Sequence, residues 1–265
     1  MKKYVLLLLL LCSGCNFSLP VVSTNDLRSD VNYDVLEKLS NKAVMWGLGK
    51  NTNEFKQPID ALNANDMYRE YDAYFVGDKD PVIYLTFDNG YENGYTPKVL
   101  EVLMEEDVYA TFFLTYDYVK DNPDLTKRMI YDGHTIGNHT YKHKSFIETS
   151  LVDIVEDVVV FEEYMHQNYH YHMDYMRPPK GEFTEQTLAL MQQLKLKTAL
   201  WSFAYYDYNV NGQMNHDDAL TKLKEGIHPG AIYLLHCVSK TNSEVLQEFI
   251  QYAKGEGYTF SLLDF

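Results

Sequence analysis

Residues 86–96 read TFDNGYENGYT and directly follow the apolar run VIYL at residues 82–85. A short apolar run of this kind predicts a buried β-strand, and the glycines after it permit tight turns. Asp88 is therefore expected at the end of a strand, where the strand fixes its position and the loop exposes it, as a reacting carboxylate of a hydrolase requires. A neutral amide, Asn89, follows Asp88 where a second acid would be expected.

Short apolar runs recur along the chain, and helical patterns separate most of them. Counting the first, they lie at residues 82–87, 109–115, 134–138, 174–177, 198–203, 231–235 and 258–262. Parallel strands need crossover connections, usually helices, so this alternation favours a parallel sheet. We expect an α/β fold, a distorted or incomplete (β/α) barrel of about seven parallel strands, with an irregular N-terminal extension.

Three features predict helices between these runs. Thr96-Pro97 offers a capping residue followed by proline, which favours the start of a helix, and Gly133 favours the end of another. Residues 151–166 carry apolar residues at helical spacing with acids on the other face. This pattern predicts a surface helix packed on a core.

The first residues indicate export. Lys2-Lys3 precedes an apolar stretch from Val5 to Leu11, which is too short to span a bilayer as a mature helix. Small residues before Cys15 resemble a lipoprotein box, although Cys12 stands where leucine is usual. We expect residues 1–15 to be an export segment and Cys15 to carry a lipid that holds the protein at the outer face of the cell membrane. Plain signal cleavage, which gives a secreted protein, and an uncleaved anchor remain open.

The rest of the chain divides into three parts. Residues 16–40 are polar and predict a tether with at most a short helix at its end. Residues 41–80 predict an irregular N-terminal extension, and residues 81–262 the main domain. Lipid attachment at Cys15 would leave Cys237 alone, so no disulfide is expected within the domain.

Composition narrows the classes of function. The 265 residues carry a formal net charge of −15, which argues against nucleic acid as a partner, because phosphates are bound by clustered Lys and Arg. The chain has 23 Tyr and 2 Trp, rings that sugar binding uses, although core packing explains such rings as well. We expect a monomer.

Reactive side chains follow five of the predicted strands: Asp88, His139, Arg177, Asp207 and His236. In a parallel barrel the carboxyl ends of the strands share one mouth, and active sites are built there. We therefore expect these groups to converge in one site.

His139 and His143 are spaced at i and i+4. On a helical turn both imidazoles would face the same side and could share one metal ion. Two surface or capping histidines would give the same spacing, but the position after Gly137-Asn138 at a strand end favours a metal site. His134 begins the strand and is expected to be structural.

Arg177-Pro-Pro-Lys-Gly181 is a stiff segment, because two prolines fix its backbone. The Arg177 guanidinium could orient a carboxylate through paired hydrogen bonds, or form a structural salt bridge at the barrel rim. Lys180 is expected either to be solvated or to contact the substrate.

His236 ends the apolar run that begins at Ile232. A satisfied core histidine is one interpretation. With Asp207 as an orienting partner, however, its imidazolium form would be favoured and it could deliver a proton. The neighbouring thiol of Cys237 has no evident activating partner other than His236, which disfavours a nucleophilic role.

Together these segments resemble the polysaccharide deacetylase family, also called the NodB-homology family or carbohydrate esterase family four, over roughly residues 80–262. The family motif TFDDG is similar to residues 86–90, H-S/T-x-x-H to 139–143, R-x-P-x-G to 177–181, DxxDW to 204–208 and L-x-H to 234–236. The segments TFDNGYENGYTPKVL, GHTIGNH and AIYLLHCVS, with Trp46-Gly47 ahead of the domain, resemble the delta-lactam-forming branch, which comprises the muramic acid N-deacetylases of peptidoglycan.

The resemblance implies metal-assisted acid–base catalysis on a glycan. It assigns catalytic roles to Asp88, Arg177, Asp207 and His236, one divalent metal ion (zinc or another) to His139, His143 and Asn89, and substrate contacts to Tyr141, Lys180 and Gly181. The metal would polarise the acetamide carbonyl and activate a water. The base would be Asp88, held by Arg177, and the acid would be His236, which protonates the departing sugar amine.

Two positions depart from the family pattern. Asn89 replaces an anionic metal ligand, so the site should hold its metal more weakly, and the muramic branch shares this asparagine. Ala204 replaces the first acid of DxxDW and Tyr208 replaces its tryptophan. Asp207 is then the only acid of this motif that could orient His236.

The function expected is an exported peptidoglycan N-deacetylase that acts on N-acetylmuramic acid in the muramic delta-lactam pathway. Its partners would be glycan strands and, through the lipid, the membrane. The alternatives are a deacetylase of N-acetylglucosamine-containing glycan and an inactive wall-glycan-binding protein, although binding alone needs no acid–base pair. An aspartate-based phosphotransferase is disfavoured because Gly90 stands where its second aspartate would be needed.

Overall fold

The computed structural model describes residues 24–265, so the predicted export segment and Cys15 lie outside the described residues. The strands are β1 (Val44–Met45), β2 (Ala73–Tyr74), β3 (Val82–Asn89), β4 (Thr111–Leu114), β5 (Thr135–Asn138), β6 (Tyr175–Met176), β7 (Glu182–Phe183), β8 (Lys197–Ala199), β9 (Phe203–Ala204), β10 (Ala231–Leu235) and β11 (Thr259–Phe260). The helices are α1 (Thr24–Ser29), α2 (Tyr33–Leu36), α3 (Ile59–Tyr68), α4 (Thr96–Glu105), α5 (Tyr116–Asp121), α6 (Pro123–Tyr131), α7 (Leu151–Tyr169), α8 (Glu185–Gln193), α9 (His216–Glu225) and α10 (Lys240–Gly255), with short 3₁₀ turns η1 (Arg69–Tyr71) and η2 (Pro179–Gly181). None of these helices is long and apolar enough to cross a membrane.

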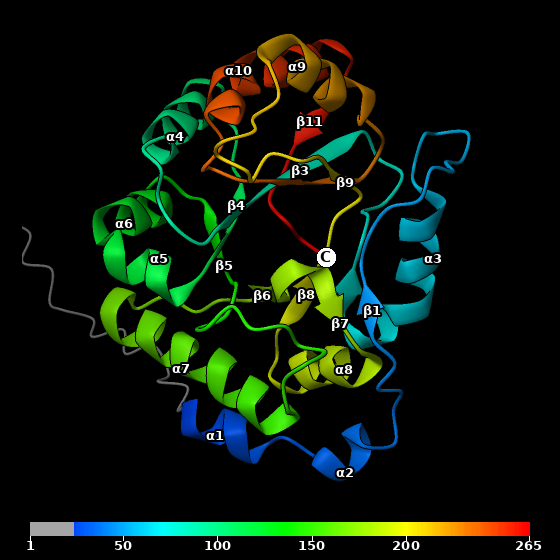
Figure 1. Ribbon diagram of the computed structural model, residues 1–265, viewed down its shortest axis with the longest axis vertical. Helices are drawn as coiled ribbons and strands as arrows, with labels where there is room; N and C mark the ends of the chain where they lie inside the picture. Colours follow the sequence, from blue (N-terminus) through cyan, green and yellow to red (C-terminus); the bar gives the residue numbers. More distant parts are fainter. Residues whose placement is uncertain (1–23) are drawn as a thin grey trace, which may run out of the picture.

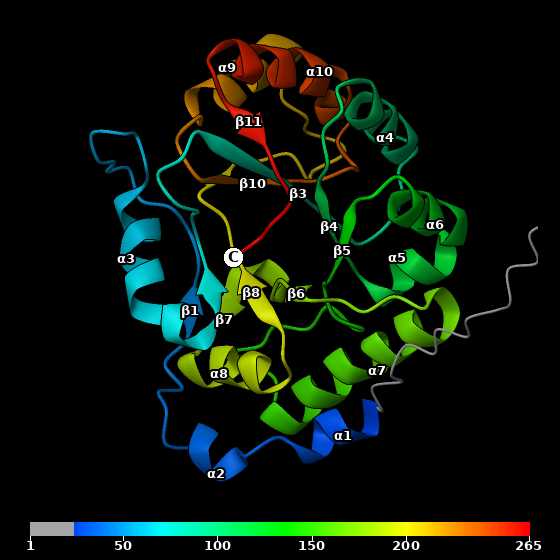
Figure 2. The ribbon, with the colours of Figure 1, turned by 180° about the vertical axis from the view of Figure 1, so that it is seen from behind.

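The main sheet has nine strands and is parallel throughout. Its order is β2-β8-β6-β5-β4-β3-β10-β9, and β11 pairs with the start of β3. The longer helices lie around the outside of these strands, as the two opposite views show (Figures 1 and 2). The α/β barrel expected from the alternation is therefore confirmed.

The barrel closes through a break in one predicted strand. The run 198–203 splits into β8, near one end of the strand order, and β9, at the other end. Between them the Leu200 amide donates to the Tyr74 carbonyl at 2.8 Å, and the Ser202 amide donates to the Ile232 carbonyl at 3.0 Å. The chain itself thus crosses between the two edges of the sheet, and this crossing is the distortion of the barrel.

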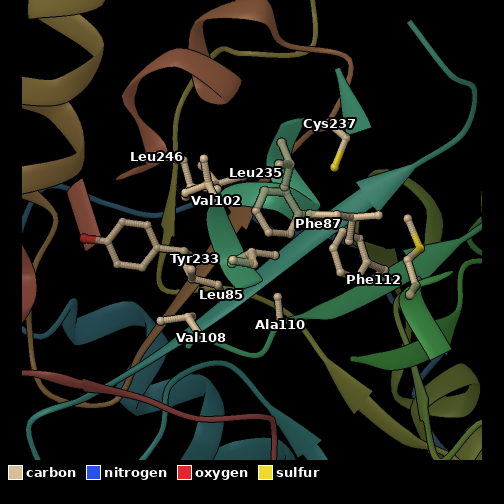
Figure 3. Close-up of a cluster of buried hydrophobic side chains, with 14 of the residues drawn as sticks. Leu85, Phe87, Val102, Val108, Ala110, Phe112, Tyr233, Leu235, Cys237 and Leu246 are labelled. Carbon is tan, nitrogen blue, oxygen red and sulfur yellow. The ribbon is translucent and has the colours of Figure 1, made fainter. Parts of the chain in front are cut away.

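Alternate residues of β3 face two different cores. Leu85 and Phe87 point to the outer core beneath the helices, where they meet Tyr233 and Leu235 of β10 (Figure 3). Tyr84 belongs to the other cluster, on the opposite face of the strand. This is the ordinary side-to-side alternation of a strand, and it decides below where neighbouring residues of the motif point.

The described part of residues 16–40 packs on the domain. Leu27, Val31 and Leu36 are buried in one cluster with residues of α7 and α8. Arg28 adds ion pairs to Glu156 at 2.9 Å and Glu163 at 2.6 Å, both on α7. Apolar residues widely spaced in a polar stretch are enough to dock these short helices.

The N-terminal extension is also more regular than expected. Its strand β2 pairs in parallel with β8 and so joins the main sheet, while β1 pairs with β7 in a separate antiparallel ribbon. Strands of two residues are too short to show an alternating pattern, which is why the sequence did not predict them.

The predicted helix boundaries are correct to within a few residues. Helix α4 begins at Thr96, but its N-cap is Tyr95 rather than Thr96. Helix α6 ends at Tyr131, and Gly133 follows in the left-handed region at φ +88°. Helix α7 continues three residues beyond the predicted 151–166 to Tyr169.

Candidate active site

The side chains that follow the parallel strands converge at the mouth of the barrel, as expected. A cavity of about 740 Å³ is lined there by Asp88, His139, His143 and His236. Arg177 and Asp207 lie behind this lining and are buried. The three residues proposed to contact substrate, Tyr141, Lys180 and Gly181, also line the cavity.

Arg177 holds the Asp88 carboxylate in place. It is fully buried, and its Nη1 donates to Asp88 Oδ1 at 2.7 Å and to the Thr86 hydroxyl at 2.9 Å. Its other donors are taken by the carbonyls of Ala199 and Leu200 at 2.8 and 2.9 Å. The prediction of paired hydrogen bonds to one carboxylate is therefore wrong, because the barrel-closing segment occupies the second arm of the guanidinium.

This arrangement keeps Asp88 ionised. Burial opposes its charge, but the Arg177 guanidinium, followed by His139 and His236, lowers the pKa of Asp88 below its ordinary value. Oδ1 is held by Arg177, whereas Oδ2 lies 3.6 Å from His139 Nε2. One carboxylate oxygen is thus anchored and the other faces the imidazoles.

His139 and His143 come together without a helix. The loop that carries them has no helical turn, and Thr140 and His143 adopt positive φ angles of 74° and 52°. The prediction of a helical turn is wrong, because the loop instead folds back, with the His143 amide donating to the Thr140 hydroxyl at 2.9 Å. The two Nε2 atoms nevertheless lie 3.2 Å apart.

These two imidazoles are prepared as neutral ligands. His139 Nδ1 donates to the Arg177 carbonyl at 2.8 Å, which leaves a lone pair on Nε2. Burial lowers the pKa of His139 to about 4, and burial also lowers the pKa of His143. Two neutral nitrogens at this distance, beside an ionised carboxylate, have the donor chemistry that a divalent cation binds. The residues therefore fit a metal.

Asn89 does not face this pair. Its side chain lies on the opposite side of β3 from Asp88, against Tyr118 and Cys237. Burial raises the pKa of the Cys237 thiol, and the nearby Asn89 amide opposes that shift. Among the described residues the Asn89 amide atoms are buried without a hydrogen-bond partner. The expected third ligand is therefore turned away from the cavity in this structure, and no described group of three or more His, Cys, Asp or Glu forms a metal cluster.

Asp207 orients His236 with help from a residue that the sequence did not reveal. Asp207 Oδ1 accepts from His236 Nδ1 at 2.7 Å, and Oδ2 accepts from the His236 amide at 2.8 Å. Asn242 of α10 donates to the same Oδ2 at 2.6 Å, and it accepts from the Tyr205 hydroxyl. Asn242 stands at helical spacing from the buried Val245, Leu246 and Phe249, and an asparagine at that position of an apolar pattern was the signal that could have identified this partner.

The pair is arranged for proton donation. Burial lowers the pKa of His236, but the Asp207 carboxylate outweighs burial and raises this pKa above its ordinary value. Since Nδ1 is bound to Asp207, Nε2 is left for the substrate. Tyr208, which stands where the family has tryptophan, contacts the His236 ring edge-on with centroids 5.7 Å apart.

The segment 177–181 is supported by the N-terminal extension. The Trp46 amide donates to the Gly181 carbonyl at 3.0 Å, and the Trp46 ring nitrogen donates to the Trp201 carbonyl at 3.0 Å. Gly181 has a positive φ of 66°, and a Cβ there would lie 2.4 Å from the Trp201 ring. Glycine is required at this position because the ring packs directly on its backbone.

These features define a (β/α)-barrel domain with an acid–base site at the mouth of the barrel. Comparison with known proteins agrees with this class: residues 76–199 match the polysaccharide deacetylase family. The chain is 43% identical to the Bacillus subtilis (strain 168) peptidoglycan-N-acetylmuramic acid deacetylase PdaA over 86% of this chain and 87% of that protein. The solved structure of Bacillus subtilis PdaA, a family 4 carbohydrate esterase, superposes with a TM-score of 0.80 at 39% identity, covering 84% of this chain and 96% of that one.

A second group of relatives is more distant. The Listeria monocytogenes (strain EGD-e) peptidoglycan-N-acetylglucosamine deacetylase PgdA is 30% identical over 69% of this chain and 38% of that protein. From these similarities the chain belongs to the polysaccharide deacetylase family, as the five motifs predicted.

Proposed function

We propose that this protein is an exported peptidoglycan N-deacetylase that hydrolyses the acetamide of N-acetylmuramic acid, in the pathway that forms muramic delta-lactam. One observation carries the proposal. Asp88, which is ionised, and His236, whose pKa is raised, line the same cavity. Hydrolysis of an amide needs a base for water and an acid for the amine, and these two groups supply both.

His139 and His143 would hold one divalent metal ion, which supplies Lewis-acid chemistry to the acetamide carbonyl when bound. Asp88, held ionised by Arg177, accepts a proton from the attacking water at Oδ2. The water oxygen bonds to the carbonyl carbon, and the carbon–nitrogen bond then breaks. His236 donates its Nε2 proton to the departing nitrogen, and Asp207 stabilises the imidazolium until then. The products are acetate and a free amino sugar.

Two observations favour muramic acid over glucosamine. The chain is more similar to the muramic acid deacetylase than to the glucosamine deacetylase, at 43% against 30% identity. In addition, Lys142 and Lys180 line the cavity of a chain whose net charge is −15. Muramic acid carries a lactyl carboxylate that glucosamine lacks, and a cavity ammonium group would favour it.

The test uses the purified protein with intact peptidoglycan and with peptide-stripped glycan, each with and without divalent metal. Products are examined by mass spectrometry, and Asp88→Asn serves as the inactive control. We expect acetyl loss from muramic acid that depends on Asp88. Acetyl loss confined to glucosamine would overturn the muramic assignment, and binding without any acetyl loss would favour a wall-binding protein.

Export and attachment are tested separately. We propose that Cys15 is lipidated, that the protein is anchored at the outer face of the membrane, and that it acts as a monomer. Labelling with a fatty-acid analogue in a bacterial host should be lost in Cys15→Ser. Equal labelling of both chains would contradict the anchor, and light scattering of the purified protein checks the monomer.

A further inference from the structure

The loop that carries His139 and His143 has a backbone that its residues do not adopt by themselves. Thr140 and His143 both lie in the left-handed region, at φ 74° and 52°. Neither is glycine, and a β-branched residue such as threonine is rarely found there. Such conformations persist only where the surrounding structure holds them. The position of His143 beside His139 therefore depends on contacts from outside the loop.

Helix α7 supplies such a contact through Asp157. Its Oδ2 accepts from the Tyr141 amide at 3.2 Å and from the Lys142 amide at 3.3 Å. The two amides are consecutive and lie between the two histidines in the chain. Hydrogen bonds to a carboxylate are about twice as strong as those between neutral groups. One oxygen on the helix thus fixes two peptide groups of the loop.

A second tie joins the same helix to the start of the loop. Asn138 Oδ1 accepts from the Thr140 amide at 2.8 Å, and Asn138 Nδ2 donates to the Val158 carbonyl at 3.1 Å. Val158 follows Asp157 in α7, a helix of 19 residues whose apolar face is buried. Two neighbouring residues of one rigid helix therefore hold the loop.

Folding alone does not require an acid at position 157. Lys142 is exposed, so water could bind its amide instead. Asp157 is half-buried, and among the described residues its Oδ1 is buried without a hydrogen-bond partner. Removing part of a carboxylate from water costs free energy. What the side chain adds is a fixed position for the peptide groups between the two histidines.

We propose that Asp157 is a positioning residue of the metal site, which holds loop 139–143 in the conformation that brings the two histidine Nε2 atoms to 3.2 Å. The proposal rests on the proposed function, since it takes His139 and His143 to hold the metal. Asp157 acts through the backbone of the loop and is not itself a ligand. Losing a group that orients metal ligands typically weakens metal binding by about ten- to a hundredfold.

The experiment measures the binding of zinc and, separately, of manganese to the metal-free parent protein and three variants by calorimetry. Asp157→Ala removes the acceptor. Asp157→Asn keeps an acceptor oxygen, because its NH₂ group can take the place of Oδ1, which accepts no hydrogen bond within the described part of the chain. Asp153→Ala is the matched control, because it removes an acid one turn away on α7 that accepts from the Ser150 hydroxyl at 2.6 Å.

We expect Asp157→Ala to weaken metal binding by about ten- to a hundredfold and Asp153→Ala to bind like the parent. Asp157→Asn should bind more tightly than Asp157→Ala. The proposal would be overturned by equal affinity of the parent and Asp157→Ala, by Asp157→Asn binding as weakly as Asp157→Ala, or by a parent that binds neither metal. Thermal unfolding of each variant confirms that it is folded.

A second measurement needs no metal. Hydrogen exchange of the Tyr141 and Lys142 amides in the metal-free protein should be faster in Asp157→Ala than in the parent, and unchanged in Asp153→Ala. Equal exchange in the parent and Asp157→Ala would show that Asp157 does not hold the loop.

Acetate release from glycan by the same proteins separates this proposal from the proposed function. If the parent releases no acetate but Asp157→Ala loses metal affinity, the positioning role holds and the deacetylase assignment fails. If the parent releases acetate and Asp157→Ala keeps both its metal affinity and its slow exchange, the positioning role is wrong and the proposed function stands.

Discussion

Replacing Asp207 with asparagine should make His236 a weaker proton donor, because less of it is protonated at a given pH. In the native site the Asp207 carboxylate accepts from His236 Nδ1, from the His236 amide and from Asn242. The side-chain amide of an asparagine has the same shape as the carboxylate but no charge. Its NH₂ group would also face the hydrogen-bond donors that the carboxylate now accepts from. Burial, which lowers the pKa of His236, would then no longer be outweighed.

The size of the effect follows from the contact that is lost. A hydrogen bond to a charged group is worth about 1.5–3 kcal/mol, and one pKa unit corresponds to about 1.4 kcal/mol. The pKa of His236 should therefore fall in Asp207→Asn, because the charged partner that raises this pKa is gone. A general acid must be protonated, so activity is lost as pH rises through this pKa. At pH values above the basic limb of the pH profile, a smaller fraction of His236 is protonated in Asp207→Asn, which should lower kcat/KM by about ten- to a hundredfold. At pH values below this limb the loss should be smaller.

The assay is a pH profile of acetate release for the parent chain, Asp207→Asn and Asn242→Ala. Asn242→Ala is the matched control. It removes the hydrogen bonds of the Asn242 side chain, one of which is to Asp207, but it keeps the carboxylate, so its basic limb should stay near that of the parent. A loss in Asp207→Asn that is the same at every pH, with the basic limb unmoved, would refute this account of His236.

Three further predictions test the metal site, the buried ion pair and acid stability. His139→Ala should lose bound divalent metal, as measured by elemental analysis after dialysis. Asn89→Ala should retain the metal, because the Asn89 amide faces away from the cavity. Equal losses in the two variants would contradict this geometry. Arg177→Met should destabilise the fold by about 3–5 kcal/mol in urea unfolding, since it leaves Asp88 buried and unpaired, and a loss below about 1 kcal/mol would contradict it. Burial lowers the pKa of His228 to about 4, so between pH 6.5 and 4 this histidine is protonated in the unfolded chain but not in the folded chain. The free energy of unfolding should therefore fall by up to about 3 kcal/mol as the pH drops across this window. The variant His228→Gln should show a smaller fall.

The sequence predicted the parts of the fold that have strong apolar patterns. Strands such as β3 and β10 are continuous apolar runs, and their carboxyl ends place Asp88 and His236 at one mouth. It did not predict β2, or the break between β8 and β9, because hydrogen bonds between distant segments define those elements.

The candidate site was predictable as a set of residues but not as a geometry. An i, i+4 spacing of histidines is compatible with a helix, yet the observed loop joins the same two nitrogens through positive φ angles at Thr140 and His143. Asn242 was missed because it lies 35 residues after Asp207, on a helix whose pattern otherwise reports only packing. Spacing therefore identified the groups that we propose react, while the partners that orient them came from tertiary contacts.

The pair Asp88-Asn89 shows why adjacency in a motif is not adjacency in a site. Consecutive residues of a strand point to opposite faces, so Asp88 enters the cavity while Asn89 lies against Tyr118 and Cys237 in the outer layer. The charge that the cavity presents to a cation beside His139 then comes from Asp88 itself. Since Arg177 holds Oδ1 at 2.7 Å and Oδ2 lies 3.6 Å from His139 Nε2, the two oxygens have separate tasks. The first keeps the carboxylate ionised and fixed, and the second is the atom that we propose accepts a proton from water.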